Sequence, residues 1–227
     1  MDLLEVMEQR HSVRSYTDRK IEDEVKEKLN QKIRECNEES GLHMQLVCNE
    51  PRAFDGFMAH YGKFSGVMNY IAMVGPKGKD LEEKVGYYGE KLVLYAQQLG
   101  LNTCWVALTY QKVKGAFQVK SGEKLSLVIA TGYGSTNGTA HHSKAEGEVS
   151  KVNGSAPEWF KKGIEASLLA PTAMNQQKFK FILNGKKVSA VCRNGFYTKI
   201  DLGIAKYHFE IGAGKENFTW SDRNDVV

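Results

Sequence analysis

Two stretches of the chain repeat one order of elements, in which an amphipathic helix is followed by a polar connection and a short strand. In the first stretch, apolar residues recur at about every fourth position from Ile21 to Ile33, and "HMQLVC" then has the composition of a strand. In the second, apolar residues recur in the same way from Phe160 to Leu168, and "KFKFIL" alternates as a strand does. Each helix has one apolar face that must be covered. The repeat therefore predicts an α+β fold with antiparallel or mixed sheets flanked by helices, in two similar lobes.

The boundary between the predicted lobes lies in a polar loop. "LSLVIATGYG" is a strand that ends at a glycine turn, and "STNGTAHHSKAEGE" after it has the composition of a surface loop. Ser155 and Glu158 then form the pattern of a capping box, which predicts that the second helix begins directly after Ser155. We place the first lobe at residues 1–138 and the second at residues 139–227.

Composition excludes several classes of protein. The chain of 227 residues has a net charge of +4, and its basic residues are mixed with acidic ones rather than gathered in a stripe, so we expect no nucleic-acid partner. No apolar stretch is long enough to cross a bilayer and the first residues lack the pattern of a signal peptide, so we expect no membrane partner and a cytoplasmic location. The four cysteines form no CxxC pair and the histidines have no ligand spacing, which predicts no metal site.

The segment "RHSVRSY" follows the short helix that opens the chain and gathers four polar side chains. These are Arg10, His11, Ser12 and Arg14. Two guanidinium groups, a hydroxyl and an imidazole suit a phosphate, because each guanidinium offers a fork of donors that matches phosphate oxygens. The same residues would also serve as ordinary loop charges with Ser12 as a helix cap. The segment is consistent with an anion site and with a plain loop.

A second unusual segment, "APTAMNQQ", occupies residues 170–177 between the second helix and its strand. Pro171 stops the helix, and the Thr172 hydroxyl and Asn175 amide can donate and accept hydrogen bonds. Pro171 and Ala173 are small enough to let a ligand approach closely. The segment suits a planar heterocycle or a phosphate, whereas a plain loop would explain Asn175 but not the density of small residues.

Together these segments resemble the FMN-dependent nitroreductase family, and within it a two-lobed branch. In that family an Arg-[Arg/His]-Ser-x-[Arg/Lys] segment and an Ala-Pro-Ser-x-x-Asn-x-Gln segment build one flavin site, and they stand here as "RHSVR" and "APTAMNQQ". "LGLNTCWVA" resembles the helix end that the family places beside the flavin ring, and "HHSK" resembles its late phosphate-binding segment. The family's Gln-Pro-Trp becomes Gln177-Lys178-Phe179, so the outer contacts of that strand differ.

The resemblance implies FMN contacts from both lobes. The phosphate and ribityl chain would be held by Arg10, His11, Ser12, Arg14, His142 and Lys144, the ring and ribityl chain would be lined by Pro171, Thr172, Ala173 and Asn175, and flavin N5 would meet the backbone near Trp105, Val106 and Ala107. Trp105 would equally serve as a core residue. Lys63 either reaches the pyrimidine side of the ring or is a surface lysine.

The positions of the two motifs imply a fused pair of lobes. Members of the family are dimers whose flavin takes one segment from each subunit, whereas here both segments occur once in a single chain, with a repeated scaffold between them. The resemblance therefore implies an internal pseudo-dimer with one FMN in the cleft between the lobes. We expect the chain to act as a monomer, although a homodimer is also compatible with the sequence.

The activity that the resemblance implies is a ping-pong oxidoreduction. NADH or NADPH would give a hydride to flavin N5, and an electron-poor small molecule, such as a nitroaromatic or a quinone, would then receive it. We assign no catalytic side chain, because the flavin carries the chemistry. Two alternatives stay open, an FMN enzyme of another reaction, such as dehalogenation or flavin breakdown, and a non-catalytic flavin-binding or sensing protein.

Overall fold

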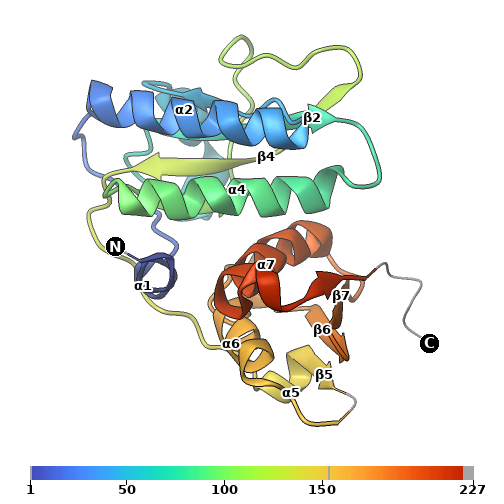
Figure 1. Ribbon diagram of the computed structural model, residues 1–227. Coiled ribbons are helices and arrows are strands. Elements are labelled where there is room, and N and C mark those ends of the chain that lie inside the picture. Colours follow the sequence, from blue (N-terminus) through green and yellow to red (C-terminus); the bar gives the residue numbers. More distant parts are fainter. Residues whose placement is uncertain (1, 153, 222–227) are drawn as a thin grey trace.

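The protein is described by a computed structural model over residues 2–152 and 154–221, and within these residues it contains two four-stranded sheets with helices packed between them (Figure 1). The last residues of the predicted second lobe, 222–227, lie outside this range. The first sheet has the spatial order β1 (Gln45–Val47), β2 (Asn69–Pro76), β4 (Glu123–Gly132) and β3 (Asn102–Val106). All of its neighbouring strands are antiparallel.

The second sheet is mixed. Its spatial order is β5 (Ser150–Val152), β6 (Phe179–Asn184), β7 (Lys187–Cys192) and β8 (Thr219–Trp220). The central pair β6 and β7 is antiparallel, and the two outer strands are parallel to their neighbours. The expected α+β class, with antiparallel and mixed sheets flanked by helices, is therefore confirmed.

Helices separate and flank the two sheets. They are α1 (Leu3–Gln9), α2 (Asp23–Ser40), α3 (Phe57–Tyr61), α4 (Leu81–Gln98), α5 (Glu146–Val149), α6 (Glu158–Ser167) and α7 (Thr198–Ala213), with short 3₁₀ turns η1 (Pro51–Phe54), η2 (Ala173–Asn175) and η3 (Lys215–Asn217). The capping box predicted at Ser155 is wrong. α6 begins at Glu158 with Pro157 as its N-cap, and no side-chain cap forms because the proline side chain has no polar atom that could accept a hydrogen bond.

Strand β2 is buried on both faces of its sheet. Ile71 and Met73 face the layer of α2 and α4, whereas Tyr70 and Ala72 face a second apolar cluster around Phe54. This alternation follows from the two-residue period of a strand. The first sheet is therefore the middle layer of its half, and its strands have little freedom to change register.

Helices α4 and α7 cross with their backbones in close contact. A Cβ atom added to Gly86 would lie 2.0 Å from the carbonyl oxygen of Ile200, and one added to Gly203 would lie 2.0 Å from that of Glu83. Each glycine thus faces the carbonyl of the residue three positions before the other glycine. Reciprocal contacts of this kind are what a two-fold axis produces.

One apolar core runs through both halves of the chain. Residues of α2, β2 and α4 pack in the same cluster as residues of α6, β6 and α7. In the second half this core is aromatic, and the rings of Phe181 and Phe209 are stacked with centroids 4.6 Å apart. The two halves therefore share their interior instead of meeting at a separate surface.

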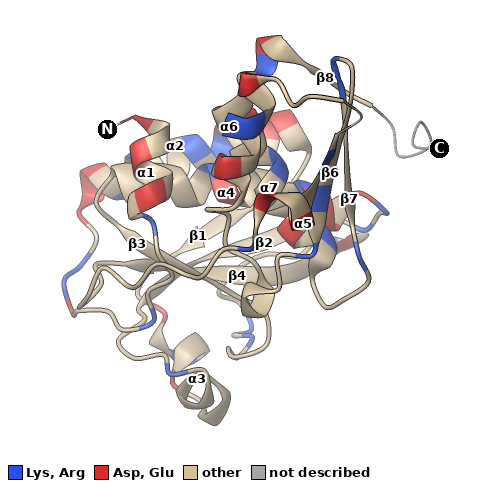
Figure 2. Ribbon diagram, turned by 90° about the horizontal axis from the view of Figure 1, so that it is seen from below, with Lys and Arg blue, Asp and Glu red and all other residues tan. Residues whose placement is uncertain are grey.

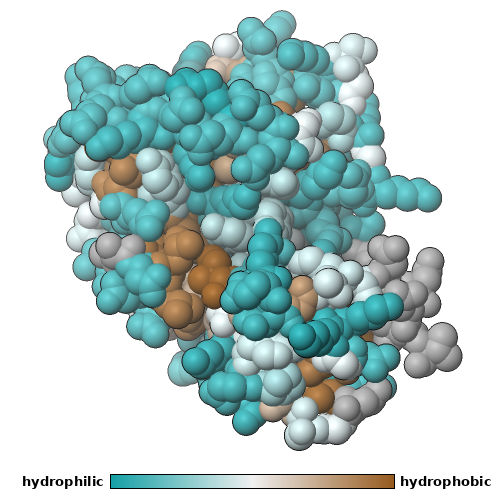
Figure 3. Space-filling model, viewed as in Figure 1, coloured by the Kyte–Doolittle hydropathy of each residue, from teal (hydrophilic) through white to brown (hydrophobic). Residues whose placement is uncertain are grey.

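The surface carries charges of both signs. Short ion pairs join neighbouring turns of α2, with Lys26 Nζ 2.9 Å from Asp23 Oδ1 and Lys28 Nζ 2.6 Å from Glu24 Oε1, and acidic and basic residues are also mixed along α6 (Figure 2). The face drawn in Figure 3 is mostly hydrophilic, and one of its apolar areas lies beside α1, where α1 meets α6 and α7. None of the helices in the described residues is long and apolar enough to span a membrane.

Candidate functional site

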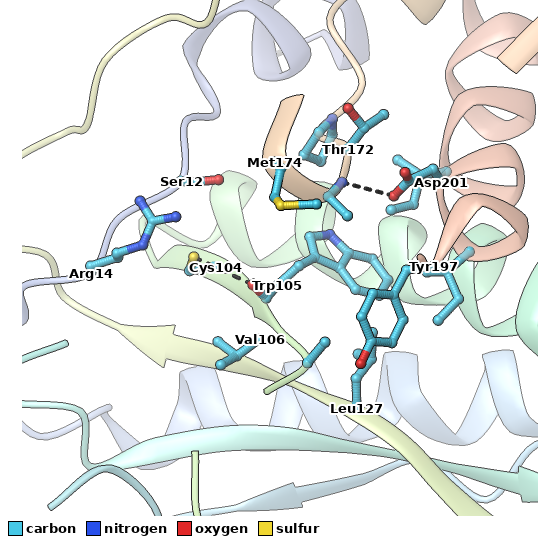
Figure 4. A pocket seen from close by; sticks show the side chains of 15 residues that line it. Ser12, Arg14, Cys104, Trp105, Val106, Leu127, Thr172, Met174, Tyr197 and Asp201 are labelled. Atoms are coloured by element: carbon cyan, nitrogen blue, oxygen red, sulfur yellow. Dashed lines mark hydrogen bonds between the residues drawn. The ribbon is translucent and has the colours of Figure 1, made fainter. Parts of the chain in front are cut away.

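A cleft opens between β3 and the first turns of α7, and the linker that ends in η2 borders it (Figure 4). Its apolar end has a volume of about 550 Å³ and its polar end about 940 Å³. The two ends are continuous, because they share the lining residues Ser12, Arg14, Pro171, Thr172 and Met174.

The apolar end is built on a tryptophan. Trp105 projects into the cleft from β3, with the Met174 side chain and the Tyr197 ring beside it (Figure 4). Aliphatic side chains complete the lining; they are Val106, Ala107, Leu127, Ile200 and Ile204. This end offers a planar ring the apolar contacts that it prefers.

The segment after α1 reaches the cleft because it runs beside β3 as an additional short strand. Val13 N donates to the Thr103 carbonyl at 3.0 Å, and Ser12 forms a parallel bridge with Thr103. This pairing lays Arg10, Ser12 and Arg14 along the edge of the sheet, at the polar end of the cleft. Backbone pairing therefore joins two segments that lie far apart in the sequence.

Arg10 is a buried cation that faces the polar end. Its side chain is 3% exposed, and its Nε lies 3.9 Å from Glu90 Oε1. Among the described residues this Nε has no hydrogen-bond partner. Burial lowers the pKa of Arg10. Arg10 lines the polar end, so this end suits an anion, because a guanidinium attracts and hydrogen-bonds anions.

The linker that borders the cleft has an unusual backbone. Met174, Asn175 and Gln177 have φ angles of 51°, 52° and 42°, in the left-handed region, where each such residue costs on the order of 1–3 kcal/mol. The buried Gln177 amide donates to Asn175 Oδ1 at 2.7 Å, and Asn175 Nδ2 donates to the His142 carbonyl at 2.8 Å. These contacts hold a conformation that the linker would not adopt alone.

Asp201, in the first turn of α7, anchors this linker and lines the cleft. Its Oδ1 accepts from Ala173 N at 3.0 Å, and its Oδ2 accepts from Gln176 Nε2 at 2.7 Å. Burial raises the pKa of Asp201 to about 6, although both donors act in the opposite direction. This residue was not among those predicted from the sequence. A lone acidic residue in the apolar helix "TKIDLGIA" is the signal that could have found it.

Most of the expected FMN contacts line the cleft. The residues that do so are Arg10, His11, Ser12, Arg14, Trp105, Val106, Ala107, Pro171, Thr172, Ala173 and Asn175. Arg14 is exposed and lines both ends, with its guanidinium 5.8 Å from the centre of the Phe64 ring. The two segments that suggested a site from the sequence thus meet in space.

Three expected residues are not part of the cleft lining. Lys63 is exposed on the turn after α3, with φ at 60°. The Lys144 ammonium donates to the carbonyls of Gln176 and Gln177 at 2.9 and 3.1 Å, so it stabilises the linker backbone without lining the cleft. The His142 side chain is exposed, and its carbonyl oxygen accepts from Asn175 Nδ2. The neighbouring His141 lines the polar end.

Further lining residues had no sequence signal. Cys104 lies at the apolar end, its Sγ 3.6 Å from the Trp105 carbonyl oxygen, and burial raises the pKa of its thiol. Gly138 lies at the polar end, where an added Cβ would meet His11 Cβ at 2.8 Å. Within residues 2–152 and 154–221, no three His, Cys, Asp or Glu side chains are placed to hold a metal ion.

A family comparison matches almost the whole chain. Residues 2–213 match the family described as "Putative TM nitroreductase". The chain belongs to this nitroreductase family. No curated protein matches the sequence.

Solved structures of nitroreductases share the fold. A structure from Thermotoga maritima, described as a "putative nitroreductase", has 22% identity and a TM-score of 0.67, covering 95% of this chain and 85% of that one. A nitroreductase family protein of Streptococcus pneumoniae has 13% identity and a TM-score of 0.52, covering 65% and 98%. A "putative nitroreductase" from Desulfovibrio desulfuricans, solved with FMN, has 17% identity and a TM-score of 0.50, covering 65% and 94%.

Proposed function

We propose that this member of the nitroreductase family is an FMN-dependent oxidoreductase. It takes reducing equivalents from NADH or NADPH and passes them to an electron-poor small molecule, of nitroaromatic or quinone type, in a ping-pong sequence. One observation carries the proposal: an apolar end built on Trp105 continues into a polar end that holds a buried arginine with an unpartnered Nε. An apolar ring that carries a phosphate tail matches both ends at once.

The residues present fit FMN. Arg10 and Arg14 would hold its phosphate, and Trp105 with Pro171 and Thr172 would confine its ring. Bound FMN would supply the redox chemistry, accepting a hydride from NAD(P)H and returning two electrons to the acceptor. Asp201 would keep the linker against the ring by accepting from Ala173 N.

The proposal includes two lobes, residues 1–138 and 139–227, that form an internal pseudo-dimer and share one FMN. Two observations support it. Apart from α3, which lies between β1 and β2, and β4, which follows β3, the halves share the order α2-β1-β2-α4-β3 and α6-β6-β7-α7-β8, and the contacts of Gly86 and Gly203 are reciprocal. A monomer with one FMN per chain follows. We also propose a cytoplasmic location, because four free thiols suit a reducing compartment.

The first test is the visible spectrum of the purified protein, followed anaerobically after addition of NADH or NADPH. A flavin band at one equivalent per chain that bleaches with one of the donors, and returns on addition of a nitroaromatic or quinone, is the expected result. A band that no donor bleaches would instead favour a binding protein. A colourless protein that refuses added FMN would overturn the proposal, and two flavins per chain would overturn the shared site.

A further inference from the structure

Large apolar side chains that are exposed to solvent border the apolar end of the cleft. Leu108 follows the lining residue Ala107 and is 68% exposed, and Phe196 precedes the lining residue Tyr197 and is 78% exposed. Met174, which itself lines the cleft, is 82% exposed. We call Leu108, Met174 and Phe196 the apolar rim. It takes one side chain from the first half of the chain and two from the second.

Hydrogen bonds join the two segments of the second half that carry rim residues. Gln176 Nε2 donates to the Phe196 carbonyl at 2.8 Å and to Asp201 Oδ2 at 2.7 Å. Asp201 Oδ1 in turn accepts from Ala173 N at 3.0 Å. The loop that carries Phe196 is thus attached to the linker that carries Met174, and both residues belong to the same wall of the cleft.

The short helix α3 extends the apolar rim on the side of the first half. It projects from the body of the protein (Figure 2), and the rings of Phe57 and Tyr61, one turn apart, are 81% and 75% exposed. A Cβ atom added to Gly62, directly after α3, would lie 2.7 Å from Thr109 Cβ, and Thr109 follows Leu108. The helix therefore lies beside the loop that carries Leu108.

Exposed apolar side chains are concentrated in this region. Eight large apolar side chains are exposed among the described residues, and six of them belong to the rim or to α3; the other two are Leu4 and Val119. Single exposed apolar residues are ordinary, whereas a group of them beside a cleft marks a surface that an apolar molecule covers. A ligand that ends inside the cleft would leave the group in water, and a ligand with an apolar extension would cover part of it.

We infer that the electron acceptor is an electron-poor ring that carries an uncharged apolar tail, and that the apolar rim selects the tail. The inference rests on the proposed function and narrows its class of acceptor. A charged tail would lose its hydration at the rim without gaining a partner there. In turnover a quinone ring would gain two electrons and two protons, one proton arriving with the hydride of NAD(P)H and one from solvent, and would leave as a hydroquinone with its tail unchanged.

The test compares two benzoquinones with the same ring, one with a decyl tail and one without it, below the concentration at which the tailed compound aggregates. With FMN-loaded wild type, kcat/KM for the tailed quinone should exceed that for the tail-less quinone by about tenfold or more, because burial of a few CH₂ groups is enough for such a factor. Calorimetric titration of flavin-free protein gives a second readout, in which the tailed quinone should also bind more tightly.

The matched variant is Leu108→Ser combined with Phe196→Ser, which removes two exposed apolar side chains and leaves the core intact. The ratio of the two kcat/KM values should fall to about threefold or less. Val119→Ser is the control and should retain the full ratio. Val119 is 46% exposed, and its neighbour Gln118 donates from its backbone N to Gln45 Oε1 on β1, the strand farthest from β3 in the first sheet.

The outcomes separate this inference from the proposed function. A wild-type ratio near one, a ratio that the double variant leaves unchanged, or an equal fall in Val119→Ser would overturn the inference and leave the function standing. If the protein binds no FMN, but flavin-free protein binds the tailed quinone and the double variant does not, the function falls and the rim keeps its role. A wild-type dimer in sedimentation that the double variant loses would show that a second copy covers the rim, and the inference would fall.

Discussion

The first turns of α7 and α4 occupy equivalent places on the two sides of the helix crossing, yet they form different surfaces. If Gly86 on α4 is matched with Gly203 on α7, the same offset in sequence matches Glu83 with Ile200 and Lys84 with Asp201. Ile200 and Asp201 line the cleft beside Trp105. Glu83 and Lys84 line a groove of about 770 Å³ beside Trp220.

The difference lies in where the polar groups find partners. In the α4 groove, Glu210 accepts from Trp220 Nε1 at 2.7 Å, from Lys215 Nζ at 2.9 Å and from the Tyr87 hydroxyl. Lys206 Nζ pairs with Glu83 Oε1 at 2.8 Å. At the α7 end, Arg10 faces an opening with its Nε unpaired among the described residues. The two ends of the crossing thus differ in that the polar groups of the α4 groove are paired, whereas Arg10 Nε is unpaired among the described residues.

The largest expected effect is a loss of stability when the close contact between α4 and α7 is disrupted. Gly86→Ala or Gly203→Ala would force a Cβ against a backbone carbonyl, and we expect each to lower the free energy of unfolding by about 3 kcal/mol or more, or Tm by roughly 6–12 °C. Thermal unfolding measures this. Gly147→Ala is the control and should leave Tm nearly unchanged, because an added Cβ meets nothing within 4 Å there. An equal fall in Tm for Gly147→Ala would contradict the conclusion that the α4–α7 contact causes the effect.

The next largest effect concerns the affinity for FMN, which should depend on the cleft and not on the α4 groove. Arg10→Met removes the buried cation while keeping the length of the side chain, and the Kd for FMN should rise by about 30- to 1,000-fold, or roughly 2–4 kcal/mol. Lys206→Met removes a cation from the α4 groove and should leave that Kd unchanged. Fluorescence titration of both variants would show the contrast. Equal weakening by the two substitutions would mean that net charge, and not the position of Arg10, attracts FMN.

A pH experiment tests Asp201, which stands where the α4 end has a lysine. The pKa of Asp201 is about 6, above the ordinary value near 4, so the folded state holds its proton more tightly than the unfolded chain does. Its contribution to stability is present below pH 4 and is lost as the pH rises to about 6. The stability of wild type relative to Asp201→Asn should therefore improve by roughly 2–3 kcal/mol between pH 7 and pH 4.

Urea unfolding at a series of pH values provides the measurement. Taking the difference between the two proteins cancels the other titrating groups, which would otherwise hide the effect. A difference that stays constant from pH 7 to pH 4 would show that Asp201 has an ordinary pKa.

The smallest expected effect compares the two tryptophans. Trp105→Phe and Trp220→Phe each remove one indole hydrogen bond to a glutamate, which should cost about 1 kcal/mol of stability. Only Trp105→Phe should also weaken FMN, by about fivefold, because only Trp105 lines the cleft. Affinity and unfolding measurements on the same two variants check both parts. Weaker FMN binding by Trp220→Phe would place flavin in the other groove.

The sequence predicted the elements better than it predicted the surroundings of individual side chains. The four-residue apolar period identified α2 through Val25, Leu29 and Ile33, although Ile21, the first residue of the period, lies before the helix begins at Asp23. It could not show that Glu90 and His208 are fully buried, since two helices from different halves must pack together to cover them. Asp201 was missed because its partners, Ala173 N and Gln176 Nε2, lie in a linker that precedes it by 28 and 25 positions.

Loop residues were the least predictable part of the site. Arg10 and Asn175 reach the cleft as expected, because β3 and Asp201 hold their segments in place. Lys63 does not line it, and His141 replaces His142, because the direction of a loop side chain changes with each backbone angle along the loop. A motif therefore predicts which segments meet more reliably than it predicts which side chain of a segment makes contact.

The shared apolar core has a consequence for the rate at which ligands are exchanged. Because α4 and α7 cross backbone to backbone within one shared core, opening the cleft as two rigid halves would have to break that packing. Under the proposed function, admission and release would then depend on the short linker at Met174, which is 82% exposed and has a left-handed backbone. The residence time of a bound molecule would accordingly reflect the local opening of about six residues, and substitutions in this linker would change dissociation rates without changing the fold.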